Sequence, residues 1–170
     1  VVTPTLQTGI QTIVQTCGLG SLRANTLLLN WLGRSSSRVL DLQNQEFGQN
    51  LRTARFYGCN LVILDAKADK WSNFSDSDQR DMYIDVWWWN DASSRLMLLM
   101  AYLMTRNEKW RDSKIRLLAV KATLGDDQNL DSLKSMLAEV RIEAEPILVA
   151  NADADAIADY SADSALVFLP

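Results

Sequence analysis

The sequence predicts an α/β fold, a three-layer sandwich around a mainly parallel but mixed sheet. Short apolar runs alternate with stretches in which apolar residues recur every three or four positions, as strands alternating with helices do. Several of the apolar runs are almost continuous, which is typical of strands covered on both faces. At 170 residues, the chain has the length of one domain, so we predict a single domain over 1–170.

The first half of the chain predicts two helices and two strands. Apolar residues at helical spacing predict helices over 5–17 and 41–58, the first stopped by Gly18 and Gly20 and the second ended by Gly58. The apolar runs at 26–31 and 60–66 predict strands, the second covered on both faces. Because the connection 65–82 has no helical pattern, the strand at 60–66 could pair antiparallel with the next one, which is why the sheet is expected to be mixed.

The second half repeats the alternation with shorter connections. Asp91, Ser93 and Ser94 are candidate N-caps of one helix, and Pro146 is expected to end another. We expect strands at 82–89, 115–122, 147–150 and 164–170, and helices at 92–107, 130–144 and 152–160.

Three consecutive tryptophans, Trp87, Trp88 and Trp89, lie in the predicted strand 82–89. Side chains alternate between faces along a strand, so Trp87 and Trp89 share one face with Asp85, and Trp88 lies on the other. A stacking platform for nucleic-acid bases would need one common face and basic flanks, whereas the flanks here are Asp85 and Asp91. We therefore predict that the indoles fill the core, each N–H with a partner. Trp89 is the one expected at any partner surface.

Composition excludes several classes of function. The net charge of −4 argues against nucleic-acid binding, which needs clustered Lys and Arg. Histidine is absent, which removes Ser-His-Asp and Cys-His catalysis and His-ligated zinc. The longest strongly apolar stretch, 96–104, is half of the roughly 20 residues that a spanning helix needs. We predict no catalytic residues, no metal ligands and no enzymatic activity.

For three local patterns, a structural interpretation is favoured over a functional one. Gly18 and Gly20 form a GxG, but it follows a helix and precedes a strand, so a tight turn is favoured over a phosphate cradle. The stretch 151–155 (NADAD) lacks the glycine and glutamate of a calcium loop, so an N-cap at Asn151 or Asp153 is favoured over a metal site. Asp65, Asp85 and Asp91 lie near strand ends and could gather at one sheet edge, without the signature of a catalytic pair.

Two blocks of the sequence resemble the cytoplasmic C-terminal domain of the cation-chloride cotransporters, the Na-K-Cl and K-Cl cotransporter family. GLGSLRANTLLLNW at 18–31 is similar to one family motif, with Ala24 and Asn30 where the family often has Pro and Gly. IDVWWWNDASSRLMLLMAYLM and the following KWR and KIR resemble a second motif. The matching residues that we expect to be structurally important are Gly18, Gly20, Asn25, Thr26, Ile84, Asp85, Trp87, Trp88, Trp110 and Arg116.

The resemblance implies a fold like that of universal stress proteins and a regulatory, dimer-forming role beneath the protein's own transmembrane transport unit. It places the chain at the cytoplasmic face of the cell membrane, as part of a multi-pass protein whose ion-binding residues lie elsewhere. The missing family insertions suggest a bacterial or archaeal relative. No cofactor is expected, although some members of the family bind adenine nucleotide, and a nucleotide-binding sensor of universal-stress-protein type is the alternative function.

Overall fold

The structure, a computed structural model, describes residues 4–16, 18–19, 22–23, 25–31, 38–66, 82–121 and 130–170. The chain divides into two compact units, Val1–Ser77 and Asp78–Pro170, which we call unit 1 and unit 2. Each is described by itself, and the single domain over 1–170 stays a prediction. Gly20 and most of the connection 65–82 lie outside the described residues.

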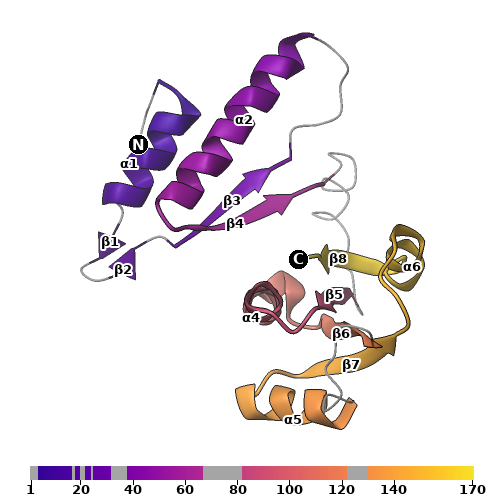
Figure 1. Ribbon diagram of the computed structural model, residues 1–170. Helices are drawn as coiled ribbons and strands as arrows, with labels where there is room; N and C mark the ends of the chain where they lie inside the picture. Colours follow the sequence, from indigo (N-terminus) through magenta and orange to yellow (C-terminus); the bar gives the residue numbers. More distant parts are fainter. Residues whose placement is uncertain are drawn as a thin grey trace. The chain divides into compact units, whose positions relative to one another are not determined.

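Unit 1 contains a short hairpin and a strand–helix–strand motif (Figure 1). The hairpin strands pair antiparallel, whereas β3 and β4 pair parallel, with Thr26 opposite Asn60. Helix α2 ends just before Gly58, whose φ of 73° is the left-handed conformation that glycine adopts readily. The elements are α1 (Leu6–Thr16), β1 (Gly18–Leu19), β2 (Leu22–Arg23), β3 (Thr26–Asn30), α2 (Arg38–Phe56) and β4 (Asn60–Leu64).

Few apolar side chains are buried in the described part of unit 1. Its buried apolar residues among the described ones are Ile10, Leu29 and Ala54. Leu28 of β3 is 58% exposed and Ile63 of β4 is 43% exposed. The prediction that the strand at 60–66 is covered on both faces is therefore wrong, because the described elements bury only part of this two-stranded sheet.

Unit 2 is built on a four-stranded sheet in the order β7-β6-β5-β8, parallel throughout. The antiparallel pairing considered for the strands at 60–66 and 82–89 does not occur: β4 pairs with β3, and β5 pairs with β6 and β8. The elements are β5 (Tyr83–Trp88), α4 (Ala92–Thr105), the short 3₁₀ helix η1 (Glu108–Trp110), β6 (Lys114–Val120), α5 (Leu130–Val140), β7 (Ala144–Val149), α6 (Ala154–Tyr160) and β8 (Ser164–Phe168).

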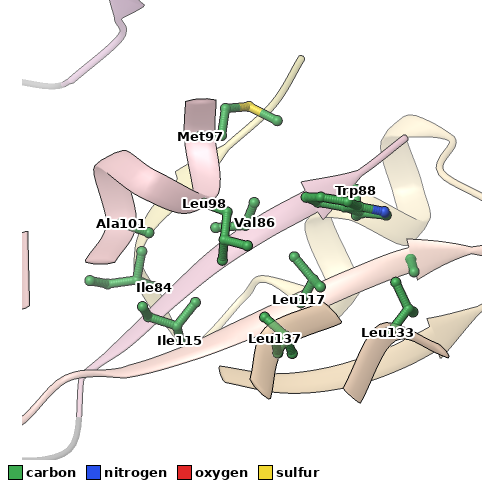
Figure 2. Packing of buried hydrophobic residues seen from close by; sticks show 11 residues of the cluster. Ile84, Val86, Trp88, Met97, Leu98, Ala101, Ile115, Leu117, Leu133 and Leu137 are labelled. Carbon is green, nitrogen blue, oxygen red and sulfur yellow. The ribbon is translucent and has the colours of Figure 1, made fainter. Parts of the chain in front are cut away.

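Helices cover both faces of this sheet, which gives unit 2 the three layers that the sequence predicts. On one face, α4 contributes Leu98 and Ala101, and α5 contributes Leu133 and Leu137 (Figure 2). These side chains meet alternate residues of the central strands: Ile84, Val86, Trp88, Ile115, Leu117 and Ala119. On the other face, Ile157 of α6 packs against a second cluster formed by Trp87, Leu118, Val120 and Val149. The protein is thus an α/β protein with parallel sheets.

Helix α5 ends earlier than predicted. It stops at Val140, and Arg141 follows with a φ of 57°, in the left-handed conformation that commonly ends helices. Pro146 does not end the helix but lies inside β7. Strand β7 is an edge of the sheet, where proline is tolerated because its missing N–H need not face a neighbouring strand.

Candidate functional site

The tryptophan run splits between the two faces of the sheet, as strand alternation predicts. Trp88 belongs to the cluster beneath α4 and α5, and Trp87 and Trp89 belong to the cluster beneath α6. Trp87 is 0% exposed and Trp88 is 1% exposed, which confirms that these indoles fill the core. Trp89 is half-buried.

The two buried indole N–H groups differ in their hydrogen bonding. Trp87 Nε1 donates to Ser161 Oγ at 3.2 Å. Trp88 Nε1, although buried, has no acceptor within the described part of the chain. The expectation that each indole N–H finds a partner is therefore met at Trp87 and not at Trp88.

The polar centre of unit 2 is an ion pair between neighbouring strands. Asp85 of β5 and Arg116 of β6 lie directly opposite each other in the parallel ladder. Arg116 donates from Nε to Asp85 Oδ1 at 2.7 Å and from Nη2 to Oδ2 at 2.9 Å. This is the bidentate geometry that a planar guanidinium offers a carboxylate. The Asp85 side chain is 0% exposed and that of Arg116 is 14% exposed, so the pair is largely removed from water.

The segment between α6 and β8 completes this ion pair. Ser164, the first residue of β8, donates its hydroxyl to Asp85 Oδ2 at 2.5 Å. Asp163 Oδ1 accepts from Arg116 Nη2 at 2.7 Å, and the backbone carbonyl of Tyr160 accepts from the same nitrogen at 3.2 Å. The polar centre therefore ties β5 and β6 to the turn that leads into the last strand.

The ring of Tyr83 supports the guanidinium group from another side. The Arg116 Cζ atom lies 4.3 Å from the centroid of the Tyr83 ring, a cation–π distance. Tyr83 precedes Asp85 by two residues on β5, so both side chains are on the same face. We call Tyr83, Asp85, Arg116, Asp163 and Ser164 the Arg116 cluster.

Electrostatics favour the charged forms of Arg116 and Asp163. The hydrogen bonds that Arg116 donates to Asp85 raise the pKa of Arg116 above its already high usual value, and burial opposes this only in part. The hydrogen bond from Arg116 lowers the pKa of Asp163, although that side chain is 58% exposed. A guanidinium held this firmly cannot act as an acid near neutral pH. The cluster can hold the strands in position, which is a structural role.

The carboxyl edge of the sheet carries capping carboxylates. Asp91 caps α4 by accepting from the backbone N of Ser94 at 2.7 Å, and this side chain's hydrogen bonds lower its pKa. Asp153 caps α6, accepting from Ala156 N at 2.8 Å and from the Asn151 side chain at 2.7 Å. The N-cap interpretation of the stretch 151–155 is confirmed.

The three aspartates that could gather at one sheet edge do not do so. Asp85 is the third residue of β5, Asp91 lies beyond the other end of the same strand, and Asp65 follows β4 in unit 1. Among the described residues, no group of three or more His, Cys, Asp or Glu side chains could hold a metal ion.

The other motif residues are distributed over both units. Ile84 joins Trp88 in the cluster beneath α4 and α5, and Trp110 at the end of η1 packs against the same cluster. Gly18 lies in β1 of the hairpin, opposite Arg23, and not at the start of a helix. In unit 1, the carbonyl of Asn25 accepts from Asn60 N at 2.7 Å, and Thr26 begins β3.

The sequence identified Arg116 as a residue of a family motif, and Asp85 as a motif residue and as one of three aspartates near strand ends, but it did not reveal their partners. Asp163 and Ser164 are 47 and 48 residues from Arg116 along the chain, and the closing SALVFLP, which begins at Ser164, resembles the end of the family pattern only loosely. The available signal was an aspartate and an arginine in the middle of two apolar strands. Charged residues are rarely fully buried unless they are paired, so each of the two predicts the other.

The sheet, its two helical layers and the Arg116 cluster define a parallel α/β domain with a buried structural ion pair. The sequence model of solute carrier family 12 matches residues 35–160. The chain is also 30% identical over 144 residues to potassium/chloride cotransporter 3 of Caenorhabditis elegans. That alignment takes in 82% of this chain and 12% of the nematode protein.

The chain therefore belongs to solute carrier family 12, the cation-chloride cotransporters, as the two motif blocks predicted. It spans only 12% of the length of the relative that it matches. Members of this family are membrane transporters of ions rather than enzymes. No helix among the described residues is long and apolar enough to cross a membrane. The bacterial or archaeal origin stays a prediction.

Proposed function

We propose that this chain is a regulatory, dimer-forming region at the cytoplasmic face of an electroneutral cation-chloride cotransporter, and that it has no catalytic activity of its own. The observation that carries the proposal is the family match to a chain that folds around an open parallel sheet. An open sheet edge cannot lie in the hydrocarbon core, where unpaired backbone groups have no water. The region therefore serves the transporter from outside the bilayer, beneath its transmembrane unit.

The two edges of the sheet support a role in self-association. Strand β7 carries Pro146 and the exposed Glu145, both of which discourage edge-to-edge pairing. Strand β8 (SALVF) contains neither a charged residue nor proline. A two-fold axis beside β8 would pair two copies of this strand antiparallel and satisfy the backbone groups of both edges. The bulge at its start, where Tyr83 pairs with Ser164 and Ile84 with Leu166, restricts such pairing to the last residues.

Sedimentation velocity of the purified chain over a concentration series tests the dimer. We expect a reversible monomer–dimer equilibrium that Val167→Lys shifts toward monomer, with Glu145→Lys on the opposite edge as the matched control. A chain that stays monomeric at the highest soluble concentration contradicts the dimer-forming role. Membrane tethering raises the local concentration, so even a weak association in solution is sufficient in the assembled transporter.

The regulatory role is tested in the full-length cotransporter. Asp85→Leu removes the buried carboxylate of the Arg116 cluster and loosens unit 2. We expect a lower ion flux per transporter at the cell surface, with the apparent affinities for the transported ions unchanged, because the ion-binding residues lie in the membrane part. A change in ion affinity at unchanged maximal flux contradicts the proposed separation of roles.

A nucleotide-binding sensor is the second candidate, and one observation favours it. The order β7-β6-β5-β8 places a topological switch point between β5 and β8, where α/β folds commonly bind ligands at the carboxyl ends of the strands. However, Asp91 and Asp153 place negative charge at the N-termini of α4 and α6, where phosphate would bind. Calorimetric titration with ATP and AMP decides between the candidates: heat of binding at millimolar ligand would favour the sensor.

A further inference from the structure

Helix α4 presents apolar side chains on its outer face as well as on its inner one. Its inner face packs Met97, Leu98 and Ala101 against the sheet. On the other side, Leu99 is 46% exposed and Leu103 is 57% exposed. These two leucines are four residues apart, so they are neighbours on one face of the helix. Isolated exposed leucines are common, but two adjacent ones on a helix form a patch.

Exposed arginines flank this patch at both ends. Arg95 precedes Leu99 by four residues, and Arg106 follows Leu103 by three. At about 100° per residue, the four positions fall within an arc of about 80° on the helix. We call Arg95, Leu99, Leu103 and Arg106 the outer stripe. The Arg106 Cζ atom lies 5.9 Å from the centroid of the Tyr102 ring, a cation–π distance.

Positive charge continues beyond the stripe. Residues 92–114 contain five basic residues and two acidic ones, Glu108 and Asp112, a net charge of +3 in a chain whose total is −4. The rest of the chain therefore carries −7. The basic residues are all exposed: Arg95, Arg106, Lys109, Arg111 and Lys114. A local excess of positive charge thus lies on α4 and the turn that follows it.

A second copy of the same stripe fits this surface poorly. In a two-fold contact, the same patch on both copies must be self-complementary. Antiparallel pairing of two outer stripes would place Arg95 against Arg106, and parallel pairing would place each arginine against its own counterpart. Both arrangements bring like charges together, which costs affinity. A surface that binds the outer stripe should therefore be apolar opposite the two leucines and negatively charged opposite the two arginines.

We propose that the outer stripe and the cations beside it dock on the anionic surface of a lipid bilayer. Leu99 and Leu103 lie at the level of the headgroups, and the arginines reach the phosphates with their charged ends, as long basic side chains at a membrane interface do. A leaflet presents negative charge at every lateral position, whereas a protein partner would need acids at the matching spacing. The inference rests on the proposed function, because the cytoplasmic leaflet is the anionic one and the parent transporter keeps the chain beside it.

Co-sedimentation of the purified chain with vesicles tests the proposal. Vesicles of phosphatidylcholine alone are compared with vesicles that also contain phosphatidylserine. We expect several-fold more bound chain on the phosphatidylserine vesicles, and less as the salt concentration rises. Leu99→Gln/Leu103→Gln and Arg95→Gln/Arg106→Gln should each lower binding several-fold. Val140→Gln/Lys134→Gln is the matched control, since it removes an exposed apolar residue and an exposed cation from α5.

The outcomes separate this proposal from the dimer. Equal binding to both kinds of vesicle, no binding to either, or the same loss in the α5 control would overturn it. Loss of the solution dimer in Leu99→Gln/Leu103→Gln would make the stripe a contact between copies and overturn it as well. A monomeric chain that binds phosphatidylserine vesicles through the stripe supports the docking surface and contradicts only the dimer-forming role. Urea unfolding of each variant verifies that the fold is retained.

Discussion

The two faces of the four-stranded sheet in unit 2 are built differently. Beneath α4 and α5, the strands present aliphatic side chains and Trp88, without a charged group. Beneath α6, the same strands present the Arg116 cluster, followed along β5 by Trp87 and Trp89. Apolar burial is non-directional, whereas a bidentate ion pair has one geometry. The first face supplies stability, and the second specifies which residues lie opposite each other.

The difference between the two faces matters for the register in which the strands pair. A slip of one residue between β5 and β6 would move every side chain to the opposite face. Asp85 would then enter the aliphatic cluster without Arg116 opposite it, and a buried unpaired charge is among the most unfavourable arrangements in a protein. The ion pair thus penalises wrong registers that a purely apolar sheet would tolerate.

Removing a large side chain from the aliphatic face should have the largest effect. Trp88→Ala leaves a cavity between β5 and the helices, so the free energy of unfolding should fall by about 3–5 kcal/mol. Val140→Ala, at a half-exposed position on α5, is the control and should change it by less than about 0.5 kcal/mol. Urea denaturation followed by tryptophan fluorescence and circular dichroism measures both. A loss at Trp88 no larger than at the control would contradict the assignment of this face as the core.

Breaking the ion pair on the other face should cost nearly as much. Asp85→Leu leaves the Arg116 guanidinium largely buried without its main partner, and we expect a loss of about 3–5 kcal/mol. In Asp85→Leu/Arg116→Leu neither charge remains, so this double variant should recover most of that loss. Denaturant unfolding of the single and double variants gives the coupling free energy between Asp85 and Arg116. If the double variant were as unstable as the sum of both singles, the coupling free energy would be zero, and Asp85 and Arg116 would not act as a pair.

A smaller difference should separate the two buried indoles. Trp87→Phe removes the hydrogen bond to Ser161 as well as part of the ring, whereas Trp88→Phe removes only ring volume among the described contacts. The first should therefore cost about 1 kcal/mol more than the second. Thermal unfolding of the two variants under one condition gives the comparison. The reverse order would mean that the N–H of Trp88 makes the stronger hydrogen bond.

Asp163, at the exposed end of the Arg116 cluster, should contribute least to the free energy of unfolding, and its contribution should depend on pH. The folded-state pKa of Asp163 is lowered, so its stabilising effect is present above the usual aspartate pKa and is lost as the pH falls through the folded value. Asp163→Asn should slightly destabilise the protein near neutral pH, by less than any change above. From about pH 5 downward, the stability of the wild type should fall more steeply than that of this variant. The free energy of unfolding of both proteins is measured as a function of pH. If both fell equally with decreasing pH, protonation of Asp163 would not be coupled to unfolding.

Local signals predicted local structure well. Gly58 marked the end of α2, and the alternation along 84–89 assigned each tryptophan to its face. Features that depend on distant parts of the chain were not predictable in this way. Which strand lies beside 60–66 depends on pairing free energies rather than on periodicity. The hydroxyl that completes the Asp85 site comes from Ser164, 79 residues away. The end of α5 was missed because an arginine, and not a glycine, adopts the left-handed conformation there.

The place of β8 in the sheet has a consequence for synthesis on the ribosome. The last strand of unit 2 lies beside the first one, and β5 borders both β6 and β8. Strands β5, β6 and β7 can assemble as they emerge. The side of β5 that pairs with β8, however, stays unpaired until β8 has been made. Until then, Asp85 lacks its serine, and the backbone of a central strand is an unpaired edge, which invites wrong association. A chain that is truncated before Ser164 therefore exposes the features that chaperones and proteases recognise, and this edge is concealed only once β8 has been synthesised.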